Sequence, residues 1–246
     1  MTTCSPDASA RGFLKGEINF ARYDNASSGP DDVASKIAAL LKKGARVLDI
    51  GCGTGVVSAL VKELSECDIT AIEPDSERAA LARRRGLKVI DGYLTENLAA
   101  ELGRFDAVVF ADVLEHLANP ADMIACASRL LVPGGFVVAS VPNAAHWTLR
   151  LDLLRGRFEY EDCGIMDATH LRWFTHESAK TFFERLGFDV ILIDQTIMVD
   201  LPAYGKRKPW KWIPRRIKLS ILRLLVRYRP RVFGCQVIIQ AKPKLV

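Results

Sequence analysis

Short apolar runs recur along the middle of the chain, and segments with apolar residues at helical spacing separate them. The runs predict strands at Arg46–Ile50, Asp68–Glu73, Leu87–Ile90, Phe105–Ala111 and Phe136–Val141. The segments between them predict helices at Thr54–Leu64, Ser76–Arg85, Thr95–Leu102 and Pro120–Leu131. Repeated strand–helix units with right-handed crossovers indicate a parallel sheet covered by helices on both faces. We therefore expect an α/β, doubly wound, Rossmann-like fold.

The pattern changes on either side of this block. Residues 1–30 are mostly polar and predict a surface arm or a cap over the ligand site, and a helix begins at Pro30 and ends before Gly44. Residues 142–175 have no clean period, and an irregular segment of this length inside a domain is usually functional. A helix at Thr175–Leu186 and strands at Phe188–Ile193 and Phe233–Ala241 complete the expected elements. We expect one domain over residues 1–246, divided into 1–43, a ligand-binding core at 44–141, an insertion at 142–175 and a basic insertion at 199–231.

Composition narrows the class of protein. With 246 residues, 49% of them hydrophobic, the chain is long and apolar enough to bury a core, so a disordered protein is excluded. The six cysteines form no C-x-x-C pair, which argues against a zinc site or a disulfide framework, and we predict no metal. Residues 1–30 lack the apolar core of a signal peptide, and no apolar run is long enough to span a bilayer. We therefore expect a cytoplasmic protein.

The first strand leads directly into a glycine-rich turn, VLDIGCGTG at 47–55. A strand, a glycine turn and a helix in this order form the usual site for a nucleotide-like cofactor, at the carboxyl ends of the strands. The glycines Gly51, Gly53 and Gly55 follow G-x-G-x-G spacing, whereas dinucleotides favour G-x-G-x-x-G. An acid such as Asp49 would repel a pyrophosphate but suits an ammonium group. The turn therefore favours S-adenosyl-L-methionine and disfavours a nucleotide-dependent oxidoreductase.

Glu73 ends the second strand, roughly 20 residues after the glycine turn, as expected for an acid that binds a ribose diol. Its two carboxylate oxygens can accept hydrogen bonds from both ribose hydroxyls.

Four segments in this order resemble the class I S-adenosylmethionine-dependent methyltransferases. They are VLDIGCGTG (47–55), AIEPD (71–75), FDAVVFADVLEHLANP (105–120) and LLVPGGFVVASVPN (130–143). The resemblance implies a seven-stranded sheet whose last strand is antiparallel, with Phe188–Ile193 and Phe233–Ala241 as its terminal hairpin.

The resemblance also implies where S-adenosyl-L-methionine binds. The loop of Gly51, Gly53 and Gly55 would face the methionine part, and Glu73 would hold the ribose. Asp91 and Gly92 would edge the adenine, and Asp112 would lie under the cofactor. The candidate set also includes the adjoining residues Cys52, Pro74 and Val113 and the acid Asp49.

The segment PNAAHWTLRLDLLRGRFEYEDCGIMDATHLRWFT, from Pro142, resembles a bacterial methyltransferase subfamily. That subfamily is associated with glycan, lipid-linked and secondary-metabolite acceptors, and is similar to ubiquinone-type O-methyltransferases and methionine-biosynthesis-associated relatives. It implies O-methylation of a small-molecule, glycan or lipid-linked acceptor. N- or C-methylation, or a non-catalytic cofactor-binding regulator on the same fold, are the alternatives. The complete set of glycines and Glu73 favours an enzyme.

A hydroxyl acceptor must lose a proton, and histidine is the natural base near neutral pH. His116 follows the fourth strand, His146 follows the fifth, and His170 lies in the irregular segment. All three are candidate catalytic bases, although each also has a structural interpretation as a packing residue.

The basic insertion predicts a helix with two distinct faces. One face carries Ile213, Ile217, Ile221, Leu224 and Tyr228, and a stripe elsewhere carries Arg216, Arg223 and Arg227. No acidic residue occurs from Leu201 onward. Residues 206–231 therefore predict either an in-plane helix on the inner face of a membrane or a lid whose apolar face packs on the domain. Nucleic-acid binding is disfavoured because no recognised module accompanies the basic residues.

Overall fold

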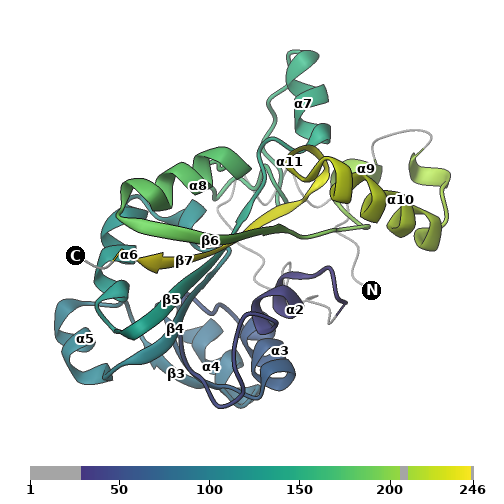
Figure 1. The fold of residues 1–246 in the computed structure, drawn as a ribbon. Coiled ribbons are helices and arrows are strands. Elements are labelled where there is room, and N and C mark those ends of the chain that lie inside the picture. The colour runs from purple at the N-terminus through teal and green to yellow at the C-terminus, as the bar shows by residue number, and fades with distance from the viewer. Residues whose placement is uncertain (1–28, 206–209, 245–246) are drawn as a thin grey trace.

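In the computed structural model, which describes residues 29–205 and 210–244, seven strands form one sheet in the order β3-β2-β1-β4-β5-β7-β6 (Figure 1). The strands are β1 Arg46–Ile50, β2 Asp68–Glu73, β3 Lys88–Asp91, β4 Phe105–Ala111, β5 Leu131–Pro142, β6 Phe188–Gln195 and β7 Gln236–Pro243. Strands β1 to β5 pair in parallel, and β7 is antiparallel to both of its neighbours. The predicted fold class, with its antiparallel last strand, is confirmed.

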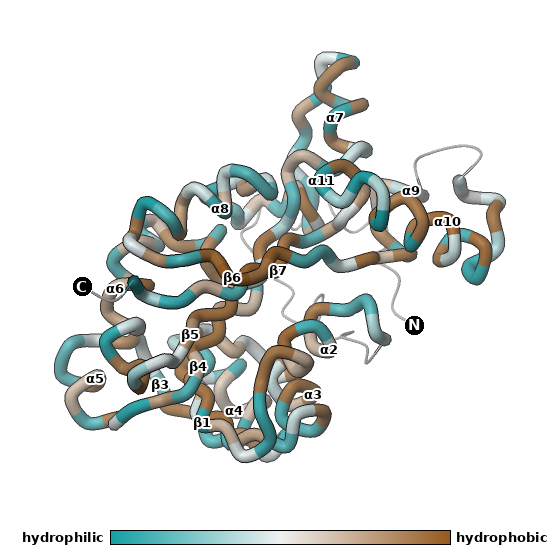
Figure 2. Tube along the Cα trace, in the orientation of Figure 1, coloured by the Kyte–Doolittle hydropathy of each residue, from teal (hydrophilic) through white to brown (hydrophobic). Residues whose placement is uncertain are grey.

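Helices cover both faces of the sheet (Figure 1). One group packs against Val47, and it comprises α2 Val33–Ala38, α3 Val56–Ser65 and α4 Ser76–Arg84. The other packs against Leu48 and Ile50, and it comprises α5 Glu96–Leu102, α6 Pro120–Ser128 and α8 His176–Arg185. Successive side chains of a strand point to opposite faces, so a strand buried on both sides reads as a continuous apolar run. Figure 2 shows the hydrophobic residues concentrated along the central strands.

Two predicted boundaries differ clearly from the structure. The helix expected from Pro30 to just before Gly44 is confined to α2, Val33–Ala38. The other difference lies between α6 and β5. The sequence predicts a helix through Leu131 that closes at Pro133-Gly134-Gly135, but α6 ends at Ser128 and β5 already begins at Leu131. Leu131 pairs with Phe105, and regular pairing resumes at Phe136 with Ala107, so the intervening residues bulge out of the ladder. A β-bulge of this kind inserts extra residues without ending the strand.

The segment 142–175 contains a helix that the sequence did not predict, α7 Trp147–Leu154, which projects from the rest of the molecule (Figure 1). The side chain of His146 caps it by accepting a hydrogen bond from the backbone N–H of Thr148. Residues 155–175 remain largely irregular and are tied by isolated bridges, one between Asn143 and Phe174 and one between Glu161 and Asp167. The predicted irregular segment is therefore partly helical.

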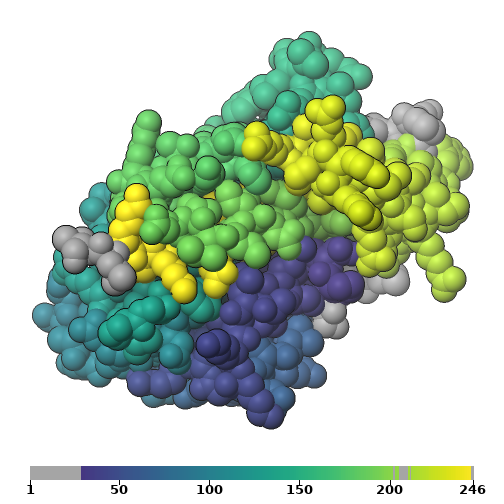
Figure 3. Space-filling model, viewed as in Figure 1, coloured from purple at the N-terminus to yellow at the C-terminus, as the bar shows by residue number. Residues whose placement is uncertain are grey.

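The basic insertion folds into α9 Pro202–Gly205, the short 3-10 helix η3 Trp210–Trp212, α10 Arg215–Tyr228 and α11 Pro230–Phe233. Leu219, Leu222 and Val226 of α10 pack in a third apolar cluster with Leu149 of α7 and Leu201. Figure 3 shows this C-terminal insertion lying against the α7 region. The predicted apolar face of the helix points outward instead, since Ile217, Leu224 and Tyr228 are 52%, 57% and 71% exposed. The alternative of a lid is therefore corrected in its face: α10 packs on the domain through Leu219, Leu222 and Val226. Of the predicted face, only Ile213 and Ile221 are half-buried.

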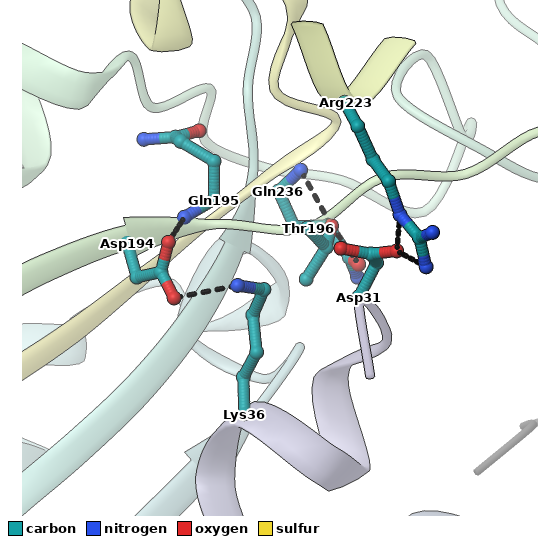
Figure 4. Close-up of polar contacts among 7 residues, drawn as sticks. All are labelled: Asp31, Lys36, Asp194, Gln195, Thr196, Arg223 and Gln236. Atoms are coloured by element: carbon teal, nitrogen blue, oxygen red, sulfur yellow. Dashed lines mark hydrogen bonds and ion pairs between the residues drawn. The ribbon is translucent and has the colours of Figure 1, made fainter. Parts of the chain in front are cut away.

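Polar contacts tie the insertion and β6 to the N-terminal helix (Figure 4). Arg223 of α10 donates to Asp31, which lies just before α2, at 2.8 Å. Lys36 of α2 forms an ion pair of 2.5 Å with Asp194 of β6. The predicted N-terminal arm and residues 206–209 lie outside the described residues. Within the described residues, no helix is both long and apolar enough to cross a bilayer.

Candidate functional site

The glycine turn lies between β1 and α3, with Gly51, Gly53 and Gly55 at φ of 76°, 57° and 80°. Residues with a Cβ rarely adopt this left-handed region. A Cβ on Gly55 would lie 2.7 Å from the Ala82 side chain, and one on Gly51 would lie 2.9 Å from Val113. A Cβ on Gly53 would have no described atom within 4 Å. Gly51 and Gly55 therefore allow close packing beneath the turn, whereas Gly53 borders open space where a ligand fits.

Asp49 is a buried acid directly before this turn, and its two carboxylate oxygens differ. Oδ2 accepts a hydrogen bond from the Ser58 hydroxyl of α3. Oδ1 is buried and has no hydrogen-bond partner among the described residues. Burial raises the pKa of Asp49 to about 6, the Ser58 hydrogen bond opposes the rise, and the charge of Glu73 adds to it. A buried oxygen without a partner is costly, so this site fits a ligand that brings a hydrogen-bond donor or a positive charge.

Glu73 lies beside the turn because β1 and β2 pair in register from Arg46–Asp68 to Ile50–Ile72. Its Oε2 accepts from the backbone N–H of Gly53 at 2.7 Å, and its Oε1 accepts from that of Asp75 at 3.1 Å. Each carboxylate oxygen can accept a second hydrogen bond, so both remain able to bind a ribose diol. Pro74 follows, and Asp75 caps α4 by accepting from two of its backbone N–H groups. Glu73 therefore fits the diol of a cofactor, and Asp49 fits its cationic end.

The predicted adenine-side residues adjoin Glu73. Asp91 pairs in register with Glu73, and the N–H of Gly92 donates to the Glu73 carbonyl at 3.0 Å. The carboxylate of Asp91 forms an ion pair of 2.8 Å with Arg83 of α4. Tyr93 is 68% exposed and follows directly. The Asp91 carboxylate is thus held on α4, and the backbone around Gly92 borders the ligand edge of the sheet.

Asp112, just after β4, is one of two described non-glycine residues in the left-handed region, with φ of 54°. Its Oδ1 accepts from the Ser140 hydroxyl at 2.9 Å and its Oδ2 from the Gln236 amide at 2.6 Å. Loss of hydration raises the pKa of Asp112 to about 6, although both hydrogen bonds oppose the rise. Backbone strain that neighbouring strands hold in place is typical of functional sites. Val113, the next residue, touches the turn through Gly51.

Cys52 lies inside the turn with a half-buried side chain. Burial and the charges of Asp49 and Glu73 raise the pKa of its thiol. A thiol without thiolate character is a poor nucleophile, so Cys52 serves as a small spacer in the turn.

The three candidate histidines fall into two groups. The rings of His116 and His170 meet edge to face, with centroids 4.8 Å apart. His146 is fully buried, and its ring nitrogens contact the Thr148 hydroxyl at 2.8 Å and the Tyr204 hydroxyl at 3.2 Å. The structure therefore joins His116 to His170 and places His146 at the helix cap of α7.

Glu115 completes the group around His116 and His170. It lies in the short 3-10 helix η2 Leu114–His116 and is 1% exposed. Neither of its carboxylate oxygens has a hydrogen-bond partner among the described residues. Burial raises the pKa of Glu115 well above its usual range, and the charges of Asp112 and Asp167 raise it further. We call Glu115, His116 and His170 the acid–histidine cluster.

A pocket of about 460 Å³ lies next to this cluster. Its lining includes Trp147, Leu151, Arg155, Ile165, Leu201 and Trp210. The carbonyl oxygen of Ile165 contacts Nδ1 of His170 at 3.1 Å, which connects the pocket wall to the cluster. A second pocket, of about 310 Å³, includes Arg46 and Asp68 and so lies at the amino ends of the strands, on the edge opposite the glycine turn.

Four residues of the site escape the sequence analysis. Ser58 holds Asp49, Ser140 and Gln236 hold Asp112, and Glu115 joins the histidines. Of the four, only Glu115 could have been proposed from the sequence, because an acid directly beside a candidate histidine after a strand is itself a candidate site residue. Ser140 and Gln236 become recognisable only when the sheet brings β4, β5 and β7 together, and Ser58 only when α3 packs against β1.

Comparisons with known proteins agree with this geometry. Residues 22–193 match a family described as a methyltransferase domain. A ubiquinone biosynthesis O-methyltransferase of Roseobacter denitrificans is 37% identical over 196 residues, which cover 76% of this chain and 72% of that protein. The protein of the same name in Xanthomonas oryzae pv. oryzae is 38% identical over 136 residues, 48% of this chain and 56% of that one. The chain thus spans about half the length of several curated relatives it matches.

Solved structures share the fold. An S-adenosylmethionine-dependent methyltransferase from Geobacter sulfurreducens, in complex with S-adenosyl-L-homocysteine, superposes with a TM-score of 0.53 at 18% identity, covering 84% of this chain and 88% of that one. At this identity the likeness concerns the fold alone.

Proposed function

This chain belongs to the class I S-adenosyl-L-methionine-dependent methyltransferases, and on that premise we propose that it transfers a methyl group to an oxygen atom of a small-molecule, glycan or lipid-linked acceptor. The observation that carries the proposal is the ligand edge of the sheet. There a left-handed glycine turn, the carboxylate of Glu73 and a buried oxygen of Asp49 converge, and this oxygen has no hydrogen-bond partner in the part of the chain that the structure describes.

Each part of this edge has a proposed role. Asp49 and the loop of Gly51, Gly53 and Gly55 hold the amino-acid end of the cofactor. Glu73 accepts hydrogen bonds from the ribose, and the backbone around Gly92 borders the adenine. Asp112 lies beneath the bound cofactor. When bound, S-adenosylmethionine supplies an electrophilic methyl group on its sulfonium. The chain then needs chiefly to align the acceptor oxygen with that methyl carbon.

Transfer to oxygen is supported by the relatives, which carry the name O-methyltransferase. A hydroxyl acceptor loses its proton during transfer, and the pair of His116 and His170 is the group we propose to assist. His146 is the less suitable candidate, because it is fully buried and its two ring nitrogens contact the hydroxyl groups of Thr148 and Tyr204.

The pocket beside Ile165 is the proposed binding site for the bulk of the acceptor. Its lining includes the apolar side chains of Trp147, Leu201 and Trp210 and the charged groups of Asp152, Arg155 and Arg157. An apolar cavity with a few charged groups suits an acceptor that has both a hydrophobic part and a polar one.

We further propose peripheral contact with an anionic membrane surface through α10. Leu222 on one side of this helix is 1% exposed and packs on the domain, while Ile217, Leu224 and Tyr228 on the other side face outward. The exposed Arg216 and Arg227 flank that outward face. An exposed apolar stripe beside cations matches the requirements of a helix that lies in the headgroup region.

The proposed activity is tested with the purified full chain, S-adenosylmethionine with a labelled methyl group, and extracts that contain phenolic, glycan and lipid-linked acceptors. We expect a labelled product that mass spectrometry identifies as an O-methyl compound, and strongly reduced labelling by Glu73→Ala at a cofactor concentration near the wild-type dissociation constant. A labelled nitrogen or carbon would redirect the proposal to N- or C-methylation. If the chain binds S-adenosyl-L-homocysteine but labels no acceptor, the non-catalytic alternative is favoured.

A further inference from the structure

We propose that the acid–histidine cluster of Glu115, His116 and His170 binds one divalent transition-metal ion on the acceptor side of the site. One potential ligand atom from each of the three residues lies within 4.8 Å of the corresponding atoms of the other two. The cluster combines residues far apart in the chain, because η2 follows β4 and His170 belongs to the segment after α7.

The carboxylate of Glu115 is the first argument. Both of its oxygens are buried without a hydrogen-bond partner among the described residues. Leaving such a group unpaired is expensive, and buried charges in proteins are paired or coordinate metals. Arg172, the nearby cation in the chain, directs its guanidinium to the carbonyl oxygens of Leu117 and Ala118 instead. A cation between Glu115 and the histidines would provide the missing partner.

The orientation of the two imidazoles is the second argument. Nδ1 of His116 lies 3.2 Å from the carbonyl oxygen of Thr169, and Nδ1 of His170 lies 3.1 Å from that of Ile165. A carbonyl oxygen only accepts, which favours the tautomer of each neutral ring with the proton on Nδ1 and the lone pair on Nε2. The Thr169 hydroxyl also lies 3.3 Å from Nδ1 of His116, but it donates its proton to Asp167 at 2.6 Å. Histidines that ligate metals through Nε2 are usually fixed in this way by a backbone carbonyl.

The backbone holds the two halves of the cluster together. The N–H groups of Leu171 and Arg172 donate to the carbonyl of Glu115 at 2.8 and 3.1 Å, which fixes the His170 segment against η2. Ligands that share an ion at bonds of about 2.1 Å lie no more than about 4.2 Å apart. Side-chain adjustments of less than about 1 Å would therefore bring the three groups into coordination.

The set of donors indicates the type of metal. Two imidazole nitrogens and one carboxylate suit Zn²⁺, Mn²⁺ or Fe²⁺, whereas Mg²⁺ and Ca²⁺ favour oxygen ligands. Such sites keep open positions for water or a substrate oxygen. The buried carboxyl groups of Asp112 and Asp167 contribute further negative charge around Glu115.

The catalytic consequence, unlike the binding itself, rests on the proposed transfer to oxygen. An acceptor hydroxyl bound at an open position would lose its proton to solvent more readily, because a metal lowers the pKa of a bound oxygen. The oxygen then forms a bond to the methyl carbon while the carbon–sulfur bond breaks, which yields the methyl ether and S-adenosyl-L-homocysteine. His116 and His170 would thus assist through the cation rather than take the proton themselves.

Calorimetry of the untagged full chain, stripped with a chelator and titrated with Mn²⁺ and with Zn²⁺, tests the site. We expect one ion per chain. Glu115→Gln and His170→Gln should each weaken binding by at least about tenfold. His176→Gln is the matched control, because this histidine begins α8 and contacts Gln195 outside the cluster. Unchanged affinity for S-adenosyl-L-homocysteine verifies that each variant is folded.

The outcomes separate this inference from the proposed function. No binding of either ion by the wild-type chain, or equal binding by the wild type and both cluster variants, overturns the metal site and leaves methyl transfer to oxygen intact. Binding that the cluster variants lose supports the site even if no acceptor is methylated. Restored methyl transfer when Mn²⁺ or Zn²⁺ is added back to the stripped chain would support both.

Discussion

The backbone N–H of Gly53 donates a hydrogen bond of 2.7 Å to Oε2 of Glu73, which joins the turn after β1 to the acid at the end of β2. One carboxylate thus serves two purposes, since it orders the glycine turn and presents acceptor lone pairs to a ribose.

Replacing Glu73 by Ala should therefore weaken binding of S-adenosyl-L-homocysteine by about tenfold to a hundredfold, since two or more hydrogen bonds are lost at about 1 kcal/mol each. Glu73→Gln keeps one oxygen that can accept from Gly53 and should lose less. Isothermal calorimetry measures both variants. Equal affinity in the wild type and Glu73→Ala would remove Glu73 from the ribose role.

The three glycines of the turn should respond differently to alanine. Gly55→Ala places a Cβ 2.7 Å from the side chains of Ala82 and Leu87, so it should lower the melting temperature strongly. Gly53→Ala meets no described atom within 4 Å and should cost only about 1–2 kcal/mol for its left-handed φ, while it obstructs the ligand. Thermal denaturation and S-adenosyl-L-homocysteine titration of both variants test this. A Gly53→Ala chain with wild-type affinity would show that the open side of the turn is not the binding face.

Cofactor affinity should fall as the pH drops through about 6, the raised pKa of Asp49. The protonated acid no longer attracts the ammonium group, and Asp49→Asn should lose this step in the profile. The stability of the cofactor-free chain should instead rise as the pH drops through the same range. An acid whose folded pKa is raised favours folding at low pH, and this contribution is lost as the pH rises from about 4 to about 6. Calorimetric titrations between pH 5 and 8 measure the affinity, and melting curves between about pH 4 and 7 measure the stability. A flat affinity profile in the wild type would contradict the assignment.

Sequence predicts this fold best where local chemistry decides the outcome. The strands Arg46–Ile50, Asp68–Glu73 and Phe105–Ala111 were predicted at their observed bounds, because a buried parallel strand is a continuous apolar run that ends in polar residues. The glycine turn and its acids likewise predict S-adenosylmethionine as the cofactor, and the resemblance of four ordered segments predicts the family; the comparisons confirm both.

Local sequence patterns predict least where tertiary contacts decide the structure. Helix α7 has apolar residues on more than one side, so its period was not visible, and its cap is the unusual residue His146. The pattern of residues predicts an apolar face on α10, but it does not show that this face is exposed. The face points outward because Leu222, on the opposite side of the helix, packs in the third apolar cluster. Gln236 reaches Asp112 only because β7 lies next to β5, a neighbour that no local pattern specifies.

Contact with anionic membranes should depend on the outward face of α10. In flotation with vesicles that contain anionic lipids, the double variant Ile217→Ser, Leu224→Ser should be recovered with the vesicles much less than the wild type, because both side chains are more than half exposed and apolar. Ser220→Ala, at an exposed position on the same helix, is the control. Equal flotation of the wild type and the double variant would refute the contact through this face, and equal flotation of the wild type with purely zwitterionic vesicles would refute the preference for anionic lipids.

The position of β7 has a consequence for how the chain folds. This strand follows α10 in the chain, yet it pairs with β5 on one side and β6 on the other, so β6 has no strand partner until β7 arrives. Contacts between segments so distant in sequence slow folding. During synthesis, β1 to β5 can assemble first, while β6 and the Gln236 support of Asp112 wait for residues 236–243 to leave the ribosome. Truncation before β7 should therefore yield a chain with an open sheet edge and a tendency to aggregate.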